Sequence, residues 1–442
     1  MIETARTATQ LPGPKSRALF DAEARFLAPG TQSVALYSKL AIDRGEGAVL
    51  YDVDGNAYVD LLAGVGVAAL GYAHPKYVAG MQRQIARVHV GSFTTEHRAA
   101  LVELIAHITP GDLNRTQFYS SGAEAVEAAV RLARSRTGKS ELVGFWGGFH
   151  GKTAGVLPLL GSNFKHQLGP LMPGTYSAPY ASCARCAFDK TFPSCEWHCV
   201  QFLKKKIEVE TAGNVAAIIV EPIPANMGVV FPADGFLEGL RKLATREKSL
   251  LIFDEVITGF RVCYGGAQTV FKVKPDLTIL GKIVGGGLPL AVYGGRKDVM
   301  SMIAPEGPAY QAGTLSGNPV AVAAGTAMLD LLRSENPYPR MDKLADHICE
   351  GFREAAMAAG VPLRIQSFGS MFTPFFLEGT VTDYASAMKA DKAAYGRFFH
   401  GMLKRGVYLP PAQWEAAFVS FAHSDRELDV AVKAAREAFR GV

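Results

Sequence analysis

Short apolar runs alternate with amphipathic helical stretches through the middle of the chain, from about residue 76 to residue 320. Four of these runs are continuous, at positions 142–145, 217–220, 250–253 and 277–280. A run without polar residues is typical of a strand that is buried on both faces, as in a parallel sheet with helices on each side. The pattern therefore predicts an α/β domain over residues 76–325, in which helices flank a mostly parallel sheet.

The N-terminal part of the chain shows a different pattern. About 45 residues of mixed helix and loop signals come first. Positions 49–60 then form two short apolar segments on either side of an Asp54-Gly55 turn, which predicts a β-hairpin. We expect residues 1–75 to belong to a domain other than the large one.

The C-terminal part mixes helical and strand-like segments. Helical patterns cover positions 341–359 and 383–405, and a strand-like piece lies at 371–376. Residues 326–442 are therefore predicted to form a smaller α+β domain, which the N-terminal segment completes.

The composition narrows the classes of protein that the chain can belong to. Of its 442 residues, 48% are hydrophobic and 20% are charged, which excludes a disordered, collagenous or coiled-coil protein. A net charge of +5 is small for this length and gives no indication of nucleic-acid binding. No apolar run reaches the roughly 18 residues of a membrane span, and the start lacks the apolar core of a secretory signal. Six cysteines do not suggest a disulfide framework, so cytoplasm is the predicted compartment.

Candidate functional residues follow three of the apolar runs. Glu221 comes after the second run, Asp254 after the third and Lys282 after the fourth. Ligands of open α/β sheets bind beyond the carboxyl ends of the strands. We therefore expect two acids and a lysine to converge on one edge of the predicted sheet.

Lys282 lies in the segment from Gly281 to Pro289, which also contains three consecutive glycines. Glycines let the backbone approach a bound ring or phosphate closely. A lysine in a desolvated pocket can lose its proton and form a Schiff base with an aldehyde. The alternative is a surface lysine before a flexible turn. The triglycine lacks the G-x-G-x-x-G spacing of a dinucleotide site.

Asp254 directly follows a predicted buried strand. A carboxylate there is costly unless a cation or hydrogen-bond donors compensate it, and a protonated pyridine nitrogen is such a cation. Strand alternation places Asp254 and Val256 on one face and Glu255 on the other. One side chain can then address a ring nitrogen while the next packs on the ring. The alternative is a helix or turn cap.

Ser121 and Glu124 fit the capping box of a helix N-terminus, and Gly122 permits close approach of a ligand. The free backbone N–H groups of such a terminus form an anion site. Many helices begin this way without binding anything.

Six motifs occur in the order and spacing of a known family. They are Ser121-Gly122-Ala123-Glu124-Ala125, Phe149-His150-Gly151-Lys152-Thr153, Glu221-Pro222, the segment Asp254–Arg261, Gly281-Lys282 and the segment Gly313–Pro319. With them, the chain resembles the class III, fold-type I pyridoxal-phosphate aminotransferases along nearly its whole length. From Glu221 onward it is most similar to the glutamate-1-semialdehyde 2,1-aminomutases of that family. The resemblance implies a large cofactor-binding domain and a smaller α+β domain.

The resemblance also implies a role for each matching residue. Lys282 would hold the cofactor's aldehyde covalently and shuttle a proton, and Asp254 would pair with the pyridine nitrogen. Val256 and Phe149 would sandwich the ring, although the family usually has tyrosine at the Phe149 position. The other implied cofactor contacts are Ser121, Gly122 and Ala123 at the phosphate, Asn226 near the ring hydroxyl, Glu221, and Thr314, which would complete the phosphate site of the neighbouring subunit. The active site would thus be shared within a homodimer.

The chain departs from the aminomutases near its N-terminus. Those enzymes hold the substrate carboxylate with an arginine, whereas residues 29–38 here contain neither arginine nor lysine. Glu415 occupies the position where the aminomutases also have a glutamate, and where many other family members place a carboxylate-binding arginine. A buried anion without a basic partner is unfavourable. We therefore expect a cationic or hydroxyl-rich substrate, such as an amino sugar or a polyamine, with Tyr37 and Glu415 as substrate residues.

Four cysteines at positions 183, 186, 195 and 199 form a second departure. Their spacing is compatible with a structural zinc site, and the alternative is a loop of free thiols. We predict no catalytic metal.

The predicted function is that of a pyridoxal-phosphate-dependent aminotransferase, which moves an amino group from an amine donor to an aldehyde or ketone. Its partners would be small molecules, with no nucleic acid and no membrane. One alternative is a glutamate-1-semialdehyde 2,1-aminomutase or an epimerase, which keeps donor and acceptor in one molecule. Another is a non-enzymatic binding module built on a zinc loop, against which the intact Lys282 and Asp254 argue.

Overall fold

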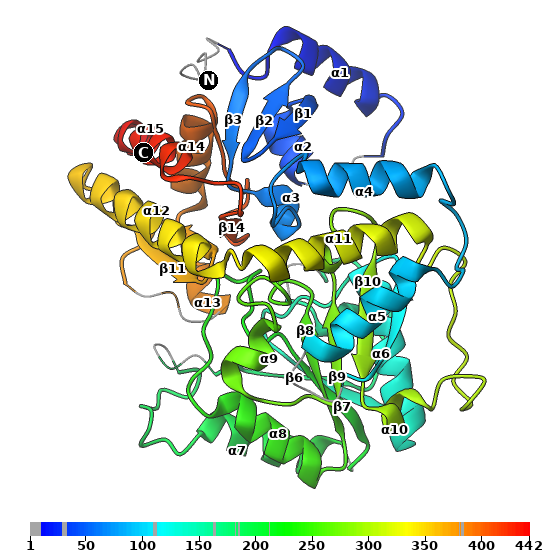
Figure 1. The fold of residues 1–442 in the computed structure, drawn as a ribbon. Helices are drawn as coiled ribbons and strands as arrows, with labels where there is room; N and C mark the ends of the chain where they lie inside the picture. The colour runs from blue at the N-terminus through cyan, green and yellow to red at the C-terminus, as the bar shows by residue number, and fades with distance from the viewer. Residues whose placement is uncertain are drawn as a thin grey trace. The chain divides into compact units, whose positions relative to one another are not determined.

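The computed structural model describes residues 10–28, 33–108, 113–161, 165–181, 183, 186–211, 213–379, 381 and 384–442 (Figure 1). The chain divides into two compact units. The larger unit comprises residues 76–336 with 382–385, and the smaller comprises residues 1–75, 337–381 and 386–442.

The larger unit is built on a seven-stranded sheet, within the described residues, of order β4-β10-β9-β8-β7-β5-β6. Strands β6, β5, β7, β8 and β9 pair in parallel, and β10 is antiparallel to both of its neighbours. The mostly parallel sheet predicted from the apolar runs is confirmed. The strands are β4 (Arg115–Tyr119), β5 (Glu141–Phe145), β6 (Thr175–Ala178), β7 (Val215–Val220), β8 (Leu250–Glu255), β9 (Leu277–Leu280) and β10 (Ala291–Gly295).

Helices pack on both faces of this sheet, and α7 and α8 lie side by side below it in Figure 1. The helical elements of this unit are α4 (Pro75–Ile85), α5 (Glu96–Ile108), α6 (Gly122–Thr137), η1 (Leu157–Leu159), α7 (His198–Glu210), α8 (Phe236–Arg246), α9 (Gly266–Phe271), η4 (Lys282–Gly285), α10 (Lys297–Met300) and α11 (Pro319–Glu335). Among the described helices of the whole chain, none is long and apolar enough to cross a membrane.

Residues of β8 alternate between two apolar clusters, one on each face of the sheet. Leu250 and Ile252 pack with α6, whereas Leu251 and Phe253 pack with α7 and α8. Successive side chains of a strand point to opposite faces. This alternation continues to the strand's end, so Asp254 lies on the face of α6.

Glu255 lies on the opposite face, where it is fully buried. Its carboxylate accepts hydrogen bonds from the Thr258 hydroxyl (2.9 Å) and from the backbone N–H groups of Ala267 (2.6 Å) and Gln268 (2.9 Å). Three donors compensate the loss of hydration that burial imposes on a carboxylate. Glu255 therefore binds the N–H groups at the start of α9, whereas its neighbour Asp254 lies on the other face of the sheet.

In its described residues, the smaller unit contains sheets of order β1-β2-β3-β13 and β11-β12-β14, a large apolar core and a smaller apolar cluster. The predicted hairpin is confirmed, because β2 and β3 pair antiparallel around the Asp54-Gly55 turn. The elements of this unit are α1 (Pro14–Ala24), α2 (Ser33–Ser38), β1 (Ile42–Glu46), β2 (Val49–Asp52), β3 (Ala57–Asp60), α3 (Ala63–Gly66), α12 (Tyr338–Ala358), β11 (Arg364–Phe368), β12 (Met371–Phe375), α14 (Lys392–Leu403), β13 (Val407–Tyr408), β14 (Ala417–Phe418), α15 (Asp425–Ala438) and η5 (Phe439–Gly441), while α13 (Tyr384–Ala387) lies at the boundary between the units.

The single helix predicted over residues 383–405 is interrupted, because α13 ends at Ala387 and a separate helix follows. Helix α14 begins at Lys392, because the Asp391 carboxylate accepts hydrogen bonds from the backbone N–H groups of Ala393 and Ala394, both at 2.9 Å. A side chain that satisfies these donors fixes a helix start. The predicted helix at 341–359 and strand at 371–376 are confirmed.

Candidate active site

Glu221, Asp254 and Lys282 lie just beyond or at the ends of β7, β8 and β9, which are neighbours in the sheet. These strands run parallel, so their carboxyl ends share one edge. The structure thus brings the three predicted residues to the same edge of the larger unit. Asp254 and Glu221 are buried, and Lys282 is half-buried.

Asp254 is held from two directions. One carboxylate oxygen, Oδ2, lies 2.8 Å from Nδ1 of His150, and the other, Oδ1, accepts a hydrogen bond from the Val256 N–H at 3.1 Å. Both side chains of the His150–Asp254 pair are almost fully buried. A carboxylate with a fixed orientation can hold a proton on a facing ring nitrogen.

His150 lies in the motif Phe149–Thr153, but no role was predicted for it from the sequence. Burial alone would lower the pKa of the imidazole, but the hydrogen bond and the charge of Asp254, with the charge of Glu221, raise it above its ordinary value. The contact with Asp254 therefore favours the protonated imidazole, and His150 is a positioning residue for Asp254.

We expect His150→Gln to destabilise the cofactor-free protein by about 2–3 kcal/mol at mildly acidic pH, since a hydrogen bond between charged groups is lost. The folded-state pKa of His150 is raised, so this stabilisation is fully present below its ordinary value of about 6.5 and is lost as pH rises through the folded value. Urea unfolding of both proteins across this pH range measures the difference. A difference that grows with rising pH would contradict the assignment.

Glu221 positions the loop that carries Phe149 and His150. Its Oε1 accepts a hydrogen bond from the Phe149 N–H at 2.8 Å. Burial raises the pKa of the Glu221 carboxyl to about 8, and the charge of His150 opposes this rise while that of Asp254 adds to it. Three buried ionisable groups thus lie close together, and a proton held on Glu221 lowers the repulsion between the two acids.

The N-terminus of α6 is where the sequence predicts an anion site. Ser121 is its N-cap, with the hydroxyl accepting a hydrogen bond from the Glu124 N–H at 3.3 Å, and the Glu124 carboxylate accepts from the Ser120 N–H at 3.1 Å. In a standard capping box the side chain at the third helical position accepts from the N–H of the N-cap residue, whereas here Glu124 accepts from Ser120, the residue before the N-cap. Gly122 and Ala123 are half-buried and supply first-turn N–H groups, which suit a phosphate.

Val256 connects this helix start to the lysine segment. A Cβ added to Gly122 would lie 3.2 Å from Val256 Cγ2, and one added to Gly281 would lie 3.0 Å from Val256 Cγ1. A side chain at either position would force Val256 to shift, so glycine favours this close packing. The half-buried Val256 therefore packs against both the start of α6 and the residue before Lys282, an arrangement compatible with pyridoxal phosphate.

The loop after β5 closes over the start of α6. Gly151 has φ +99°, and a Cβ there would come within 2.6 Å of the Ala123 Cβ. Within α6, Glu127 accepts hydrogen bonds from the Thr153 hydroxyl (2.6 Å) and the Gly155 N–H (2.9 Å). These contacts fix the backbone that holds Phe149, a half-buried residue that directly precedes His150.

Lys282 begins the short helix η4 with φ +48°, a left-handed conformation that is unfavourable for a side chain with a Cβ. The turn is held at its far end, where the Gly286 N–H donates to the Ile283 carbonyl and the Tyr77 hydroxyl donates to the Gly286 carbonyl at 2.5 Å. Backbone strain of this kind persists only where surrounding contacts enforce it, and it is frequent at active sites.

Gln311 anchors the loop that precedes α11, and the sequence analysis overlooked it. Its buried side chain accepts hydrogen bonds from the Tyr119 hydroxyl (3.2 Å) and from Arg131 (3.3 Å). No motif signal marks a glutamine of this kind. Thr314 is exposed on the anchored loop, and its contact with a partner's phosphate stays a prediction. Asn226 lies half-buried in the segment after β7.

The two predicted substrate residues lie in the smaller unit. Tyr37 is 58% exposed on α2, which the Tyr408 hydroxyl holds by donating to the Val34 carbonyl at 3.0 Å. Glu415 is half-buried. Burial raises the pKa of the Tyr408 hydroxyl to about 12, and the charge of Glu415 contributes to the rise. Residues 29–32 of the stretch without basic residues lie outside the described residues.

The family model of the class III aminotransferases matches residues 31–432 of this chain. A glutamate-1-semialdehyde 2,1-aminomutase of Roseiflexus castenholzii is 45% identical over 435 residues, which cover 97% of this chain and 98% of that protein. The enzyme of the same name from Heliobacterium modesticaldum is 42% identical over 443 residues, or 97% of each chain. Among solved structures, an omega-transaminase from Sphaerobacter thermophilus superposes with a TM-score of 0.83 at 27% identity, covering 97% of this chain and 98% of that one.

Proposed function

Because the chain belongs to the class III aminotransferases, a family of fold-type I enzymes that use pyridoxal 5′-phosphate, we propose that it is an aminomutase that moves the amino group of glutamate-1-semialdehyde from carbon 2 to carbon 1. The observation that carries this proposal is the identity of 40–45% with several full-length aminomutases. The intermolecular transfer predicted from the sequence alone becomes the second candidate.

The proposed roles follow from the positions of the side chains. Bound pyridoxal phosphate supplies an electron sink for charge that develops on the substrate carbon. Asp254, oriented by His150, holds the proton on the ring nitrogen. Lys282 holds the cofactor between turnovers and moves a proton at the carbon that carries the amino group. Val256 supports one face of the ring, and the first turn of α6 binds the phosphate.

The test of intramolecular transfer is turnover without a second substrate. The enzyme with its cofactor should convert glutamate-1-semialdehyde into 5-amino-4-oxopentanoate over many cycles, at an ordinary kcat of about 1–10³ s⁻¹, with no added amine donor or acceptor. The reaction is an isomerisation, so no atoms enter or leave. Product that stops at one equivalent per active site and resumes only with an amine donor would contradict the proposal.

The second candidate is transfer from an amine donor to a cationic or hydroxyl-rich carbonyl compound. One observation favours it: residues 29–38 contain no arginine or lysine. A substrate carboxylate would then lack a bidentate partner. The same assay with matched anionic, neutral and cationic aldehydes separates the candidates, since the first requires a preference for the anionic compound.

Class III aminotransferases are typically homodimers that act on small molecules. We propose that this chain also forms a homodimer in which Thr314 of one subunit reaches the phosphate site of the other. The predicted cytoplasmic location stays a prediction.

A further inference from the structure

Four cysteines outside the active site line one small cavity in the segment between β6 and α7. The cavity has a volume of about 20 Å³, and its walls include the side chains of Cys183, Cys186, Cys195 and Cys199. This volume is close to that of a single water molecule or ion. None of the four cysteines forms a disulfide.

We propose that these four cysteines bind one structural zinc ion. Tetrahedral coordination by four thiolates is a preferred arrangement for zinc, and the spacings C-x2-C and C-x3-C are typical of paired zinc ligands. Cys199 lies in the first turn of the 13-residue helix α7. His198 also lines the cavity, and its ring packs against Phe188 with ring centroids 4.9 Å apart.

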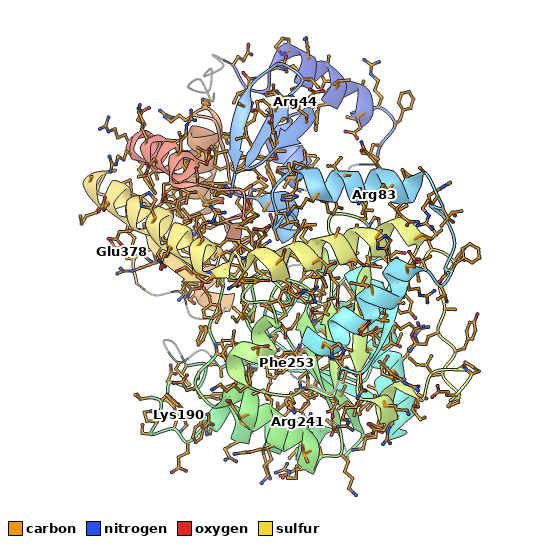
Figure 2. The ribbon with its side chains drawn as sticks, in the orientation of Figure 1. Arg44, Arg83, Lys190, Arg241, Phe253 and Glu378 are labelled. Carbon is orange, nitrogen blue, oxygen red and sulfur yellow. The ribbon has the colours of Figure 1, made fainter. Side chains whose placement is uncertain are left out.

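Zinc binding requires a local adjustment of the thiols. In the described part of the chain, no three cysteine, histidine or acidic side chains are already arranged around a common metal position. Rotation of the cysteine side chains toward the cavity that they line would complete the site. Four S–H bonds are then replaced by four Zn–S bonds, four protons leave, and no electrons are transferred. The resulting complex has a charge of −2, and Lys190, which also lines the cavity, offsets part of it (Figure 2).

The ion would stabilise a segment that contacts the active-site backbone. The Tyr180 hydroxyl donates to the carbonyl of Pro222, the residue after Glu221, at 2.8 Å. The Ala233 N–H donates to the Ala181 carbonyl at 3.0 Å, and the Trp197 indole N–H donates to the Asp234 carbonyl at 2.8 Å. The cysteine segment is therefore attached to both ends of the stretch from Glu221 to Asp234, which also contains Asn226.

The experiment is metal analysis of the full-length enzyme, purified with its cofactor under reducing conditions without chelator. We expect about one zinc per chain, and on the order of a tenfold lower content in Cys183→Ser and Cys199→Ser. Cys263→Ser is the matched control, because Cys263 lies outside the cluster and its hydrogen bond to the Gly266 carbonyl can be made by a serine hydroxyl. This control should keep its zinc.

A second measurement on the wild-type protein does not depend on the folding of variants. Removal of zinc with a chelator should lower Tm, and addition of Co²⁺ should produce the visible absorption of a tetrahedral thiolate site, which excess Zn²⁺ abolishes. Wild-type protein without zinc, zinc that remains in both cysteine variants, iron in place of zinc, or disulfides within the cluster would each overturn the proposal.

Discussion

Replacing Lys282 with alanine is expected to lower kcat by at least about 10³-fold, because no other group can take over both covalent attachment and proton transfer at the substrate carbon. Lys282 lies at the carboxyl edge of the sheet, directly after Gly281, which packs against Val256. The cofactor should still bind through the first turn of α6 and Asp254. Reduction with borohydride followed by mass spectrometry should leave cofactor attached to the wild-type chain and none attached to the variant.

Lys272→Ala is the matched control for this experiment. Lys272 is also a lysine in left-handed backbone, with φ +54°, but it is exposed at the end of α9. Alanine has a Cβ, as lysine does, so replacement at either position leaves the cost of the left-handed backbone conformation nearly unchanged. Lys272→Ala should retain activity and cofactor attachment. If Lys282→Ala remained as active as Lys272→Ala, the assignment of Lys282 would be wrong.

The Asp254→Asn enzyme should lose roughly 10²–10³-fold in kcat, since a neutral amide no longer favours a protonated ring nitrogen. The amide is similar in shape and can still accept the hydrogen bond that the Val256 N–H donates to Asp254. The loss should therefore appear in kcat more than in the folded structure. Steady-state kinetics over a range of pH, together with the absorption spectrum of the bound cofactor, measure it.

Asp276→Asn controls for the removal of a buried carboxylate in general. Asp276 is buried at the start of β9 and pairs with Arg241 and Arg296, each at 2.6 Å. Its replacement should lower Tm, because two cations lose their partner, but should leave kcat nearly unchanged. A loss of kcat as large as that of Asp254→Asn would show that buried charge as such, and not its position at the ring, causes the effect.

The sequence motifs and the chain-wide similarity favour different substrates. Positions 29–38 contain no arginine or lysine that could bind a substrate carboxylate, whereas the overall identity favours the aminomutases. Motifs near the cofactor are common to the whole family and cannot distinguish its reactions. Donor-free turnover therefore decides between the two candidates more directly than a further comparison of sequences.

The sequence by itself determined four of the seven described strands of the large sheet. Continuous apolar runs predicted β5, β7, β8 and β9, and the alternation along β8 separated Asp254 from Glu255. These inferences depend on local periodicity and burial, which neighbouring residues encode.

Only the tertiary structure decided which side chains support the site. His150 meets Asp254 across 104 residues of chain, and Glu221 meets the Phe149 N–H across 72. Gln311 reaches Tyr119 across 192. Such partners depend on the packing of α6 and the loops against the sheet, which no local pattern specifies. Local sequence patterns therefore predict which residues belong to the candidate site. Long-range contacts between helices, loops and the sheet determine the orientation and the charge environment of those side chains.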